Sequence, residues 1–191
     1  MTDDKNQAKY INSPQSLIYD KSNILYGLFE AKNAIRNKKE AILVEGYADV
    51  LAMHSAGFEN VVPGSGTSLT SGQLKLLKRY AAKLYFMLDA DSAGIAAMEK
   101  GLLLALKNNF EVKVVRLTAG EDPDTMIQKN GKKSIDYAIR DALDFIDFKM
   151  ELFKESGKLD SPQGLSESVR DMINLIKQIP DELQHDFYIS R

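Results

Sequence analysis

Acidic side chains follow three of the four short apolar runs in this sequence. They are Glu45, Asp89, Asp91, Asp122 and Asp124. If the runs are parallel strands of one sheet, their carboxyl ends meet at one edge and bring the acids together. Several carboxylates in one place repel each other strongly, and a bound divalent cation removes that repulsion. The spacing therefore predicts a metal site of the kind that aligns oxygens in phosphoryl or nucleotidyl transfer.

The remaining residue types narrow the choice of metal. The chain has no cysteine and only two histidines, so we expect oxygen ligands, which favour Mg²⁺ or Mn²⁺ over zinc or copper. Asp49 lies one helical turn after Glu45, and we expect it to orient a metal ligand or the helix start. Taken singly, each acid also fits a structural role at a turn or helix start, as Asp122 does before Pro123.

The hydrophobic pattern indicates which elements position these acids. Short apolar runs predict strands at residues 41–45, 60–62, 83–89 and 111–117. Helical spacing predicts helices at residues 24–38, 48–55, 73–81 and 93–108. Their alternation favours an α/β fold, a parallel-stranded sheet flanked by helices. We expect this α/β domain to occupy residues 23–140.

The pattern changes near residue 140, and residues 141–191 predict an all-helical subdomain. A first helix, ending near Gly157, is marked by Phe145, Phe148, Leu152 and Phe153. Ser161 and Pro162 predict the start of a second helix, as N-cap and first-turn proline. Its apolar face is expected to carry Val169, Ile173 and Ile176. A third helix is expected to carry Leu183, Phe187 and Tyr188.

Composition excludes several classes of protein. The 191 residues are 44% hydrophobic, which is enough for one sizeable core. A net charge of −2 is too balanced for binding nucleic acid by overall charge, so such binding needs a local basic patch or metal ions. The lack of cysteine excludes disulfides and thiol catalysis. No apolar run is long enough to span a membrane, and we expect a cytoplasmic protein.

The acids stand in three short motifs, EGYAD at residues 45–49, LDADSAG at 88–94 and GEDPD at 120–124. These resemble the three acidic motifs of the Toprim domain in bacterial DnaG-type primases. A GTS segment at residues 66–68 matches the family in the expected order. KYINSP at residues 9–14 and DKSNILYGL at 20–28 are similar to segments just before the primase Toprim region. The resemblance covers nearly the whole chain from Lys9.

The resemblance implies a catalytic core that uses ribonucleoside triphosphates to make short RNA primers on a single-stranded DNA template. It implies Mg²⁺ or Mn²⁺ held by Asp89, Asp91, Asp122 and Asp124. Glu45 would join these ligands or act as general base for the attacking 3′-hydroxyl. Nucleotide or template contacts are implied for Lys9, Lys21, Gly66 and Thr67. From the residues alone, the loop at 64–67 fits either phosphate binding by backbone N–H groups or a tight turn before an N-cap at Thr70 or Ser71.

The resemblance also implies boundaries and partners. Residues 1–22 are expected to be a remnant of a preceding basic subdomain or linker, and the helical subdomain is expected to be cut short. We expect no zinc in this chain, and we expect a replicative helicase to bind through a domain that the chain lacks. A monomer working at the replication fork is the expected state.

Three other functions compete with primer synthesis. A Toprim nuclease uses similar carboxylates with water as the nucleophile, but the KYINSP-like segment disfavours it. A phosphatase with Asp89 as covalent nucleophile leaves Glu45 and Asp122 unexplained. The third alternative is a metal- and DNA-binding scaffold without turnover.

Overall fold

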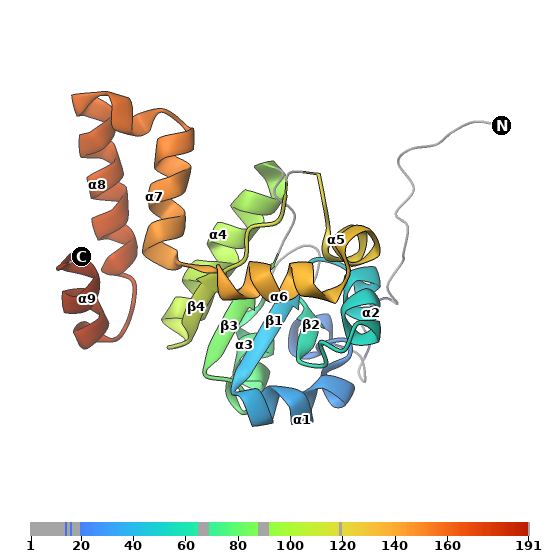
Figure 1. The fold of residues 1–191 in the computed structure, drawn as a ribbon. Coiled ribbons are helices and arrows are strands. Elements are labelled where there is room, and N and C mark those ends of the chain that lie inside the picture. Colours follow the sequence, from blue (N-terminus) through green and yellow to red (C-terminus); the bar gives the residue numbers. More distant parts are fainter. Residues whose placement is uncertain are drawn as a thin grey trace.

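The computed structural model describes Pro14, Ser16 and residues 20–64, 69–87, 92–118 and 120–190. Within these residues, five strands form one sheet in the order β2-β1-β3-β4-β5 (Figure 1). The strands are β1 (Glu40–Val44), β2 (Val61–Pro63), β3 (Lys83–Phe86), β4 (Glu111–Val114) and β5 (Leu143–Asp144). The first four are parallel, and β5 pairs antiparallel with β4. The predicted α/β fold with a parallel-stranded sheet is confirmed.

Helices cover both faces of the sheet. In the α/β part they are α1 (Leu28–Lys38), α2 (Tyr47–Ser55), α3 (Ser71–Lys78), α4 (Ser92–Lys107), α5 (Pro123–Asn130) and α6 (Lys132–Arg140). The tail contributes α7 (Phe145–Glu155), α8 (Pro162–Ile176) and α9 (Glu182–Ile189). Two short 3₁₀ helices, η1 (Lys21–Asn23) and η2 (Lys158–Asp160), complete the described elements. None of the described helices is long and apolar enough to cross a membrane.

Alternating side chains of the strands feed two separate cores. On one face, Leu43 and Phe86 pack with side chains of α1, α3 and α4, together with Phe145 and Phe148 of α7. On the other face, Ile42 and its neighbours pack with side chains of α2, α5 and α6. Because successive residues of a strand point to opposite faces, a strand buried on both faces is apolar throughout. This explains why β1 reads as a continuous apolar run.

Three expectations from the sequence were wrong in detail. The tail is not entirely helical, because Leu143 and Asp144 form β5 on the edge of the sheet. The first helix begins at Leu28 rather than residue 24, because Gly27 has a left-handed backbone at the N-cap and η1 precedes it. On α8, Ile176 is buried, but Val169 and Ile173 are exposed. The predicted N-cap at Ser161 is confirmed, since its side chain accepts a hydrogen bond from the Gly164 backbone.

Candidate metal and nucleotide site

The carboxyl ends of the parallel strands lie at one level. The Gly64 N–H donates to the Val44 carbonyl at 2.7 Å, which ties the end of β2 to the end of β1. The Met87 N–H donates to the Leu43 carbonyl at 2.9 Å, which ties β3 to β1 in the same way. The segments carrying the first two acidic motifs therefore leave the sheet at the same edge. Asp89 and Asp91, just beyond Met87, lie outside the described residues.

The first motif combines an exposed acid with a buried one. Glu45 follows β1 directly and is exposed, whereas Asp49 is 7% exposed. The Asp49 Oδ2 accepts a hydrogen bond from the Gly46 N–H at 2.9 Å, in a capping arrangement at the start of α2. This bond fixes the helix start next to Glu45, which is one of the two roles expected for Asp49.

The third motif begins α5. The Asp122 Oδ1 accepts a hydrogen bond from the Thr125 N–H at 2.7 Å, and Pro123 occupies the first helical turn. The Asp124 Oδ1 accepts from the Gln128 side-chain amide at 2.8 Å. Since α5 packs against α2, the third motif is on a helix that contacts the helix of the first motif.

Among the described residues, no three acidic or histidine side chains are close enough together to hold a metal ion. The predicted five-acid site also needs Asp89 and Asp91, so it stays a prediction. The available donors fit a hard cation. The two imidazoles are each within hydrogen-bond distance of a backbone carbonyl, His54 Nε2 at 3.0 Å from that of Val61 and His185 Nε2 at 2.5 Å from that of Ile179. Carboxylate oxygens are therefore the natural ligands here.

Lys21 lies at the start of α3. The Gln73 side-chain amide donates to the backbone carbonyls of Lys21 and Ile24, at 3.0 and 3.1 Å. The Thr70 hydroxyl donates to the Ser22 carbonyl at 2.5 Å. Thr70 is also the N-cap of α3, one of the two caps expected for that loop. These bonds hold η1 against the helix that follows the loop of Gly66 and Thr67. Those two residues and Lys9 lie outside the described residues.

Two arrangements near this edge were not expected from the sequence. The ring centroids of Tyr26 and Tyr47 lie 4.5 Å apart, at an interplanar angle of 43°. Tyr47 is part of the EGYAD motif and Tyr26 of the LYGL segment, so their place in the motifs was the one available signal.

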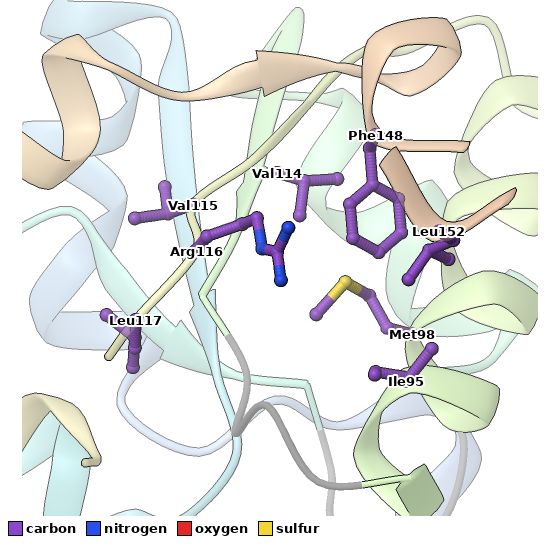
Figure 2. Close-up of a pocket in the computed structure, with 8 residues that line it drawn as sticks. All are labelled: Ile95, Met98, Val114, Val115, Arg116, Leu117, Phe148 and Leu152. Carbon is purple, nitrogen blue, oxygen red and sulfur yellow. The ribbon is translucent and has the colours of Figure 1, made fainter. Parts of the chain in front are cut away.

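The second unexpected arrangement is Arg116, which follows β4. It bonds to Glu151 and Glu155 of α7, with 2.7 Å between the nitrogen and oxygen in each pair. Hydrogen bonds to these two carboxylates raise the pKa of Arg116. Figure 2 shows the guanidinium beside a small apolar cavity of about 20 Å³ between β4, α4 and α7. Apart from Arg116, its lining is Ile95, Met98, Val114, Val115, Leu117, Phe148 and Leu152.

Three family models match successive parts of the chain. The model of the N-terminal domain of the DNA primase catalytic core matches residues 1–32. A Toprim-like model matches residues 42–127. The model of the DnaB-helicase binding domain of primase matches residues 146–191. This last match differs from our expectation that a replicative helicase binds through a domain that the chain lacks.

Curated relatives point the same way. The DNA primase of Clostridium acetobutylicum is 37% identical over 189 residues, which cover 98% of this chain and 31% of that protein. The DNA primase of Aquifex aeolicus is 45% identical over 127 residues, which cover 66% of this chain and 26% of that protein. The chain thus spans 31% or less of the length of these two relatives.

Solved structures share the fold over almost the whole chain. The Aquifex aeolicus primase, with its zinc-binding and RNA polymerase domains, gives a TM-score of 0.83 at 35% identity and covers 97% of this chain and 44% of that one. A DnaG primase catalytic domain bound to single-stranded DNA gives a TM-score of 0.83 at 31% identity. The match covers 95% of this chain and 60% of that one. The E. coli primase catalytic core gives a TM-score of 0.83 at 30% identity. The match covers 96% of this chain and 60% of that one.

Proposed function

Because the chain belongs to the bacterial DnaG-type primase family, we propose that it joins ribonucleotides into short RNA primers on a single-stranded DNA template. The observation that carries this proposal is the likeness to primase catalytic cores over at least 95% of the chain, at a TM-score of 0.83. The protein would act in the cytoplasm, at the replication fork. The nuclease and scaffold alternatives predict different products in the experiment below.

In this proposal, the divalent metal is Mg²⁺ or Mn²⁺. Its ligands would be Asp89, Asp91, Asp122 and Asp124, with Glu45 as a fifth ligand or as the base that accepts the 3′-hydroxyl proton. When bound, such a cation neutralises the triphosphate and lowers the pKa of the attacking hydroxyl. The outward-facing Glu45 would stand beside that hydroxyl, while Asp49 keeps the start of α2 in place.

Binding of the nucleotide and template would involve Lys9, Lys21, Gly66 and Thr67. Lys21 is exposed at the start of α3, where the N-terminal N–H groups of a helix favour a phosphate. The reaction is attack of a 3′-hydroxyl on the α-phosphorus of the incoming nucleotide, with release of pyrophosphate. Positioning and charge neutralisation carry most of such a step.

The test is primer synthesis by the 191-residue chain on an oligonucleotide template with radiolabelled ribonucleotides. The Asp89→Asn, Asp91→Asn double variant should lose about a hundredfold or more of the activity, because loss of metal charge costs several kcal/mol in the transition state. The matched control is Asp136→Asn on α6, which changes an exposed acid away from the motifs. EDTA should abolish synthesis, and added Mg²⁺ should restore it.

The same reactions separate the alternatives. A nuclease would shorten an end-labelled template in a metal-dependent way without extending any strand. A scaffold would bind template but incorporate no label. Equal activity of the Asp89→Asn, Asp91→Asn variant and the wild type would contradict the proposed site.

The match over residues 146–191 supports a second proposal, that the tail contacts the replicative helicase. The tail would then do part of what we had assigned to a domain outside the chain. Sedimentation of the 191-residue chain with a purified bacterial replicative helicase should give a joint boundary. A helicase boundary that does not change when the chain is added would contradict this proposal.

A further inference from the structure

An aromatic surface lies at the start of α1, next to the first acidic motif. Phe29, in the first turn of α1, is 75% exposed, and Tyr26, three residues earlier, is 45% exposed. The Tyr26 ring leans on Tyr47, which lies two residues after Glu45. We call Tyr26, Phe29 and Tyr47 the aromatic patch. The Tyr26–Tyr47 contact places the start of α1 at the end of the sheet where the first acidic motif lies.

The local backbone holds this surface outward. Leu25 and Ala31 are buried in the core shared with the sheet, which anchors the chain on both sides of Tyr26 and Phe29. Gly27 has a φ of +69°, and the Ala31 N–H donates to its carbonyl at 2.9 Å. This left-handed turn lets Tyr26 point away from the core while Leu25 points into it. The backbone conformation of this segment therefore determines the exposure of Tyr26 and Phe29.

One lysine lies over a ring of this surface, and a second precedes Tyr26 in the sequence. The Lys32 ammonium is 3.8 Å from the centroid of the Phe29 ring. Lys21 is exposed in η1, a few residues before Tyr26, while the Asp20 carboxylate is bonded to Ser22 and Asn23. Glu30 is the acid of the first turn of α1. Exposed rings interleaved with lysines are the combination that proteins use to bind single-stranded nucleic acid, by stacking on bases and pairing with phosphates.

We infer that Tyr26 and Phe29 are a base-stacking platform for the single strand that serves as template. The inference rests on the proposed primase function, and adds a binding surface to it. A strand whose bases stack here would pass the start of α2, next to Glu45. Stacking is tolerant of sequence because every base has a flat face, which suits a template that must be read at any base.

The chain offers a matched control on another helix. Tyr137 on α6 is 55% exposed, and Arg140, three residues later, lies 4.9 Å from its ring centroid, as Lys32 lies over Phe29. Arg140 is bonded to Asp141, and α6 packs on the face of the sheet opposite to α1. This pair has the same chemistry as Phe29 and Lys32 but lies on the other face.

The experiment measures binding of fluorescein-labelled oligothymidylate to the 191-residue chain by fluorescence anisotropy, with Mg²⁺ present. The Tyr26→Leu, Phe29→Leu variant should weaken binding roughly 25-fold or more, because each of the two lost stacks costs about fivefold or more. The ring-conserving Tyr26→Phe, Phe29→Tyr variant and the Tyr137→Leu control should stay within about twofold of the wild type. A duplex of equal length should be bound equally by all variants, because its bases are already stacked.

Each other outcome has a defined meaning. Equal single-strand affinity of the leucine variant and the wild type would overturn the platform while leaving the primase proposal intact. If the wild-type chain binds no oligothymidylate, the proposal that this chain binds the template is wrong, and so is the proposed platform. If the double leucine variant does not fold, Phe29→Leu alone decides the question, since three quarters of that side chain is already in solvent.

Discussion

Asp49 and Asp122 each use a carboxylate oxygen to cap the start of a helix, at α2 and α5. Structural and chemical roles are therefore compatible at these positions, because a carboxylate has two oxygens and several lone pairs. A carboxylate can therefore accept a backbone N–H and still take part in a second interaction. A capping bond to the backbone also fixes the rotamer of the acid, which a metal ligand requires.

Gly72 leaves the space that η1 occupies beside the start of α3. A Cβ at this position would lie 2.6 Å from the Ser22 carbonyl oxygen and 2.1 Å from the Asn23 Oδ1. Alanine favours a helix over glycine by up to about 1 kcal/mol, but the clash involves backbone and cannot be relieved by one side chain. We expect Gly72→Ala to lower the free energy of unfolding by about 1–2 kcal/mol, measured by urea denaturation.

The same substitution should displace η1, and with it Lys21, from the start of α3. Nucleotide affinity at low urea should therefore fall even where the protein is fully folded. Ser71→Ala, one residue earlier and exposed, is the matched control, and we expect stability and affinity close to wild type. Wild-type stability in Gly72→Ala would show that the loop moves aside without cost, and that η1 is not tightly held.

At the scale of elements, helices and strands could be predicted where the hydrophobic pattern extends over enough residues to be recognised. The parallel strands and the helices between them are in this group. β5 was missed because two residues, Leu143 and Asp144, carry no alternation that could be recognised. The shift of α1 to Leu28 was missed because Ile24 and Leu25 fit a helical period that Gly27 interrupts.

The sequence predicted some features of the candidate site and missed others. Motif spacing and the rule that parallel strands end at one edge predict that the acids meet, and this stays a prediction because Asp89 and Asp91 lie outside the described residues. The capping bonds of Asp49 and Asp122 were also within reach, because Asp before Pro and Asp at the third helical position are known cap patterns. The Tyr26–Tyr47 contact could not be predicted from the spacing of either motif, since it joins residues 21 positions apart in the sequence.

At the scale of the whole molecule, the helical tail and the sheet share one core. Phe145 and Phe148 of α7 belong to the same buried cluster as Leu43 and Phe86 of the sheet, and so does Ile176 of α8. β5 also adds the first residues of the tail to the sheet. The boundary that we expect near residue 140 therefore separates two patterns of structure, and we propose that it does not separate two units of stability.

Ion pairs of Arg116 and Lys149 join the tail to the α/β part. The cation belongs to the α/β part in the first case and to the tail in the second. Arg116, after β4, bonds to two acids of α7, and Lys149 of α7 bonds to Glu99 of α4 at 2.5 Å. Arg116 also lines the apolar cavity of Figure 2, between β4, α4 and α7. Each ion pair is partly exposed, so each contributes modestly to the free energy of unfolding, in the range of about 0.2–1 kcal/mol.

If the molecule unfolds as one unit, Arg116→Met should destabilise the sheet and α8 equally. We expect a loss of about 1 kcal/mol at low salt, because Glu151 and Glu155 lose their shared cation, and a smaller loss at high salt. Native-state hydrogen exchange would measure the opening free energies of β1 and α8 separately. Arg140→Met removes an exposed pair within α6 and its neighbouring turn, and should change neither value. Faster exchange in α8 with β1 unchanged would instead mean that the tail opens on its own, and that the boundary near residue 140 is energetic as well as structural.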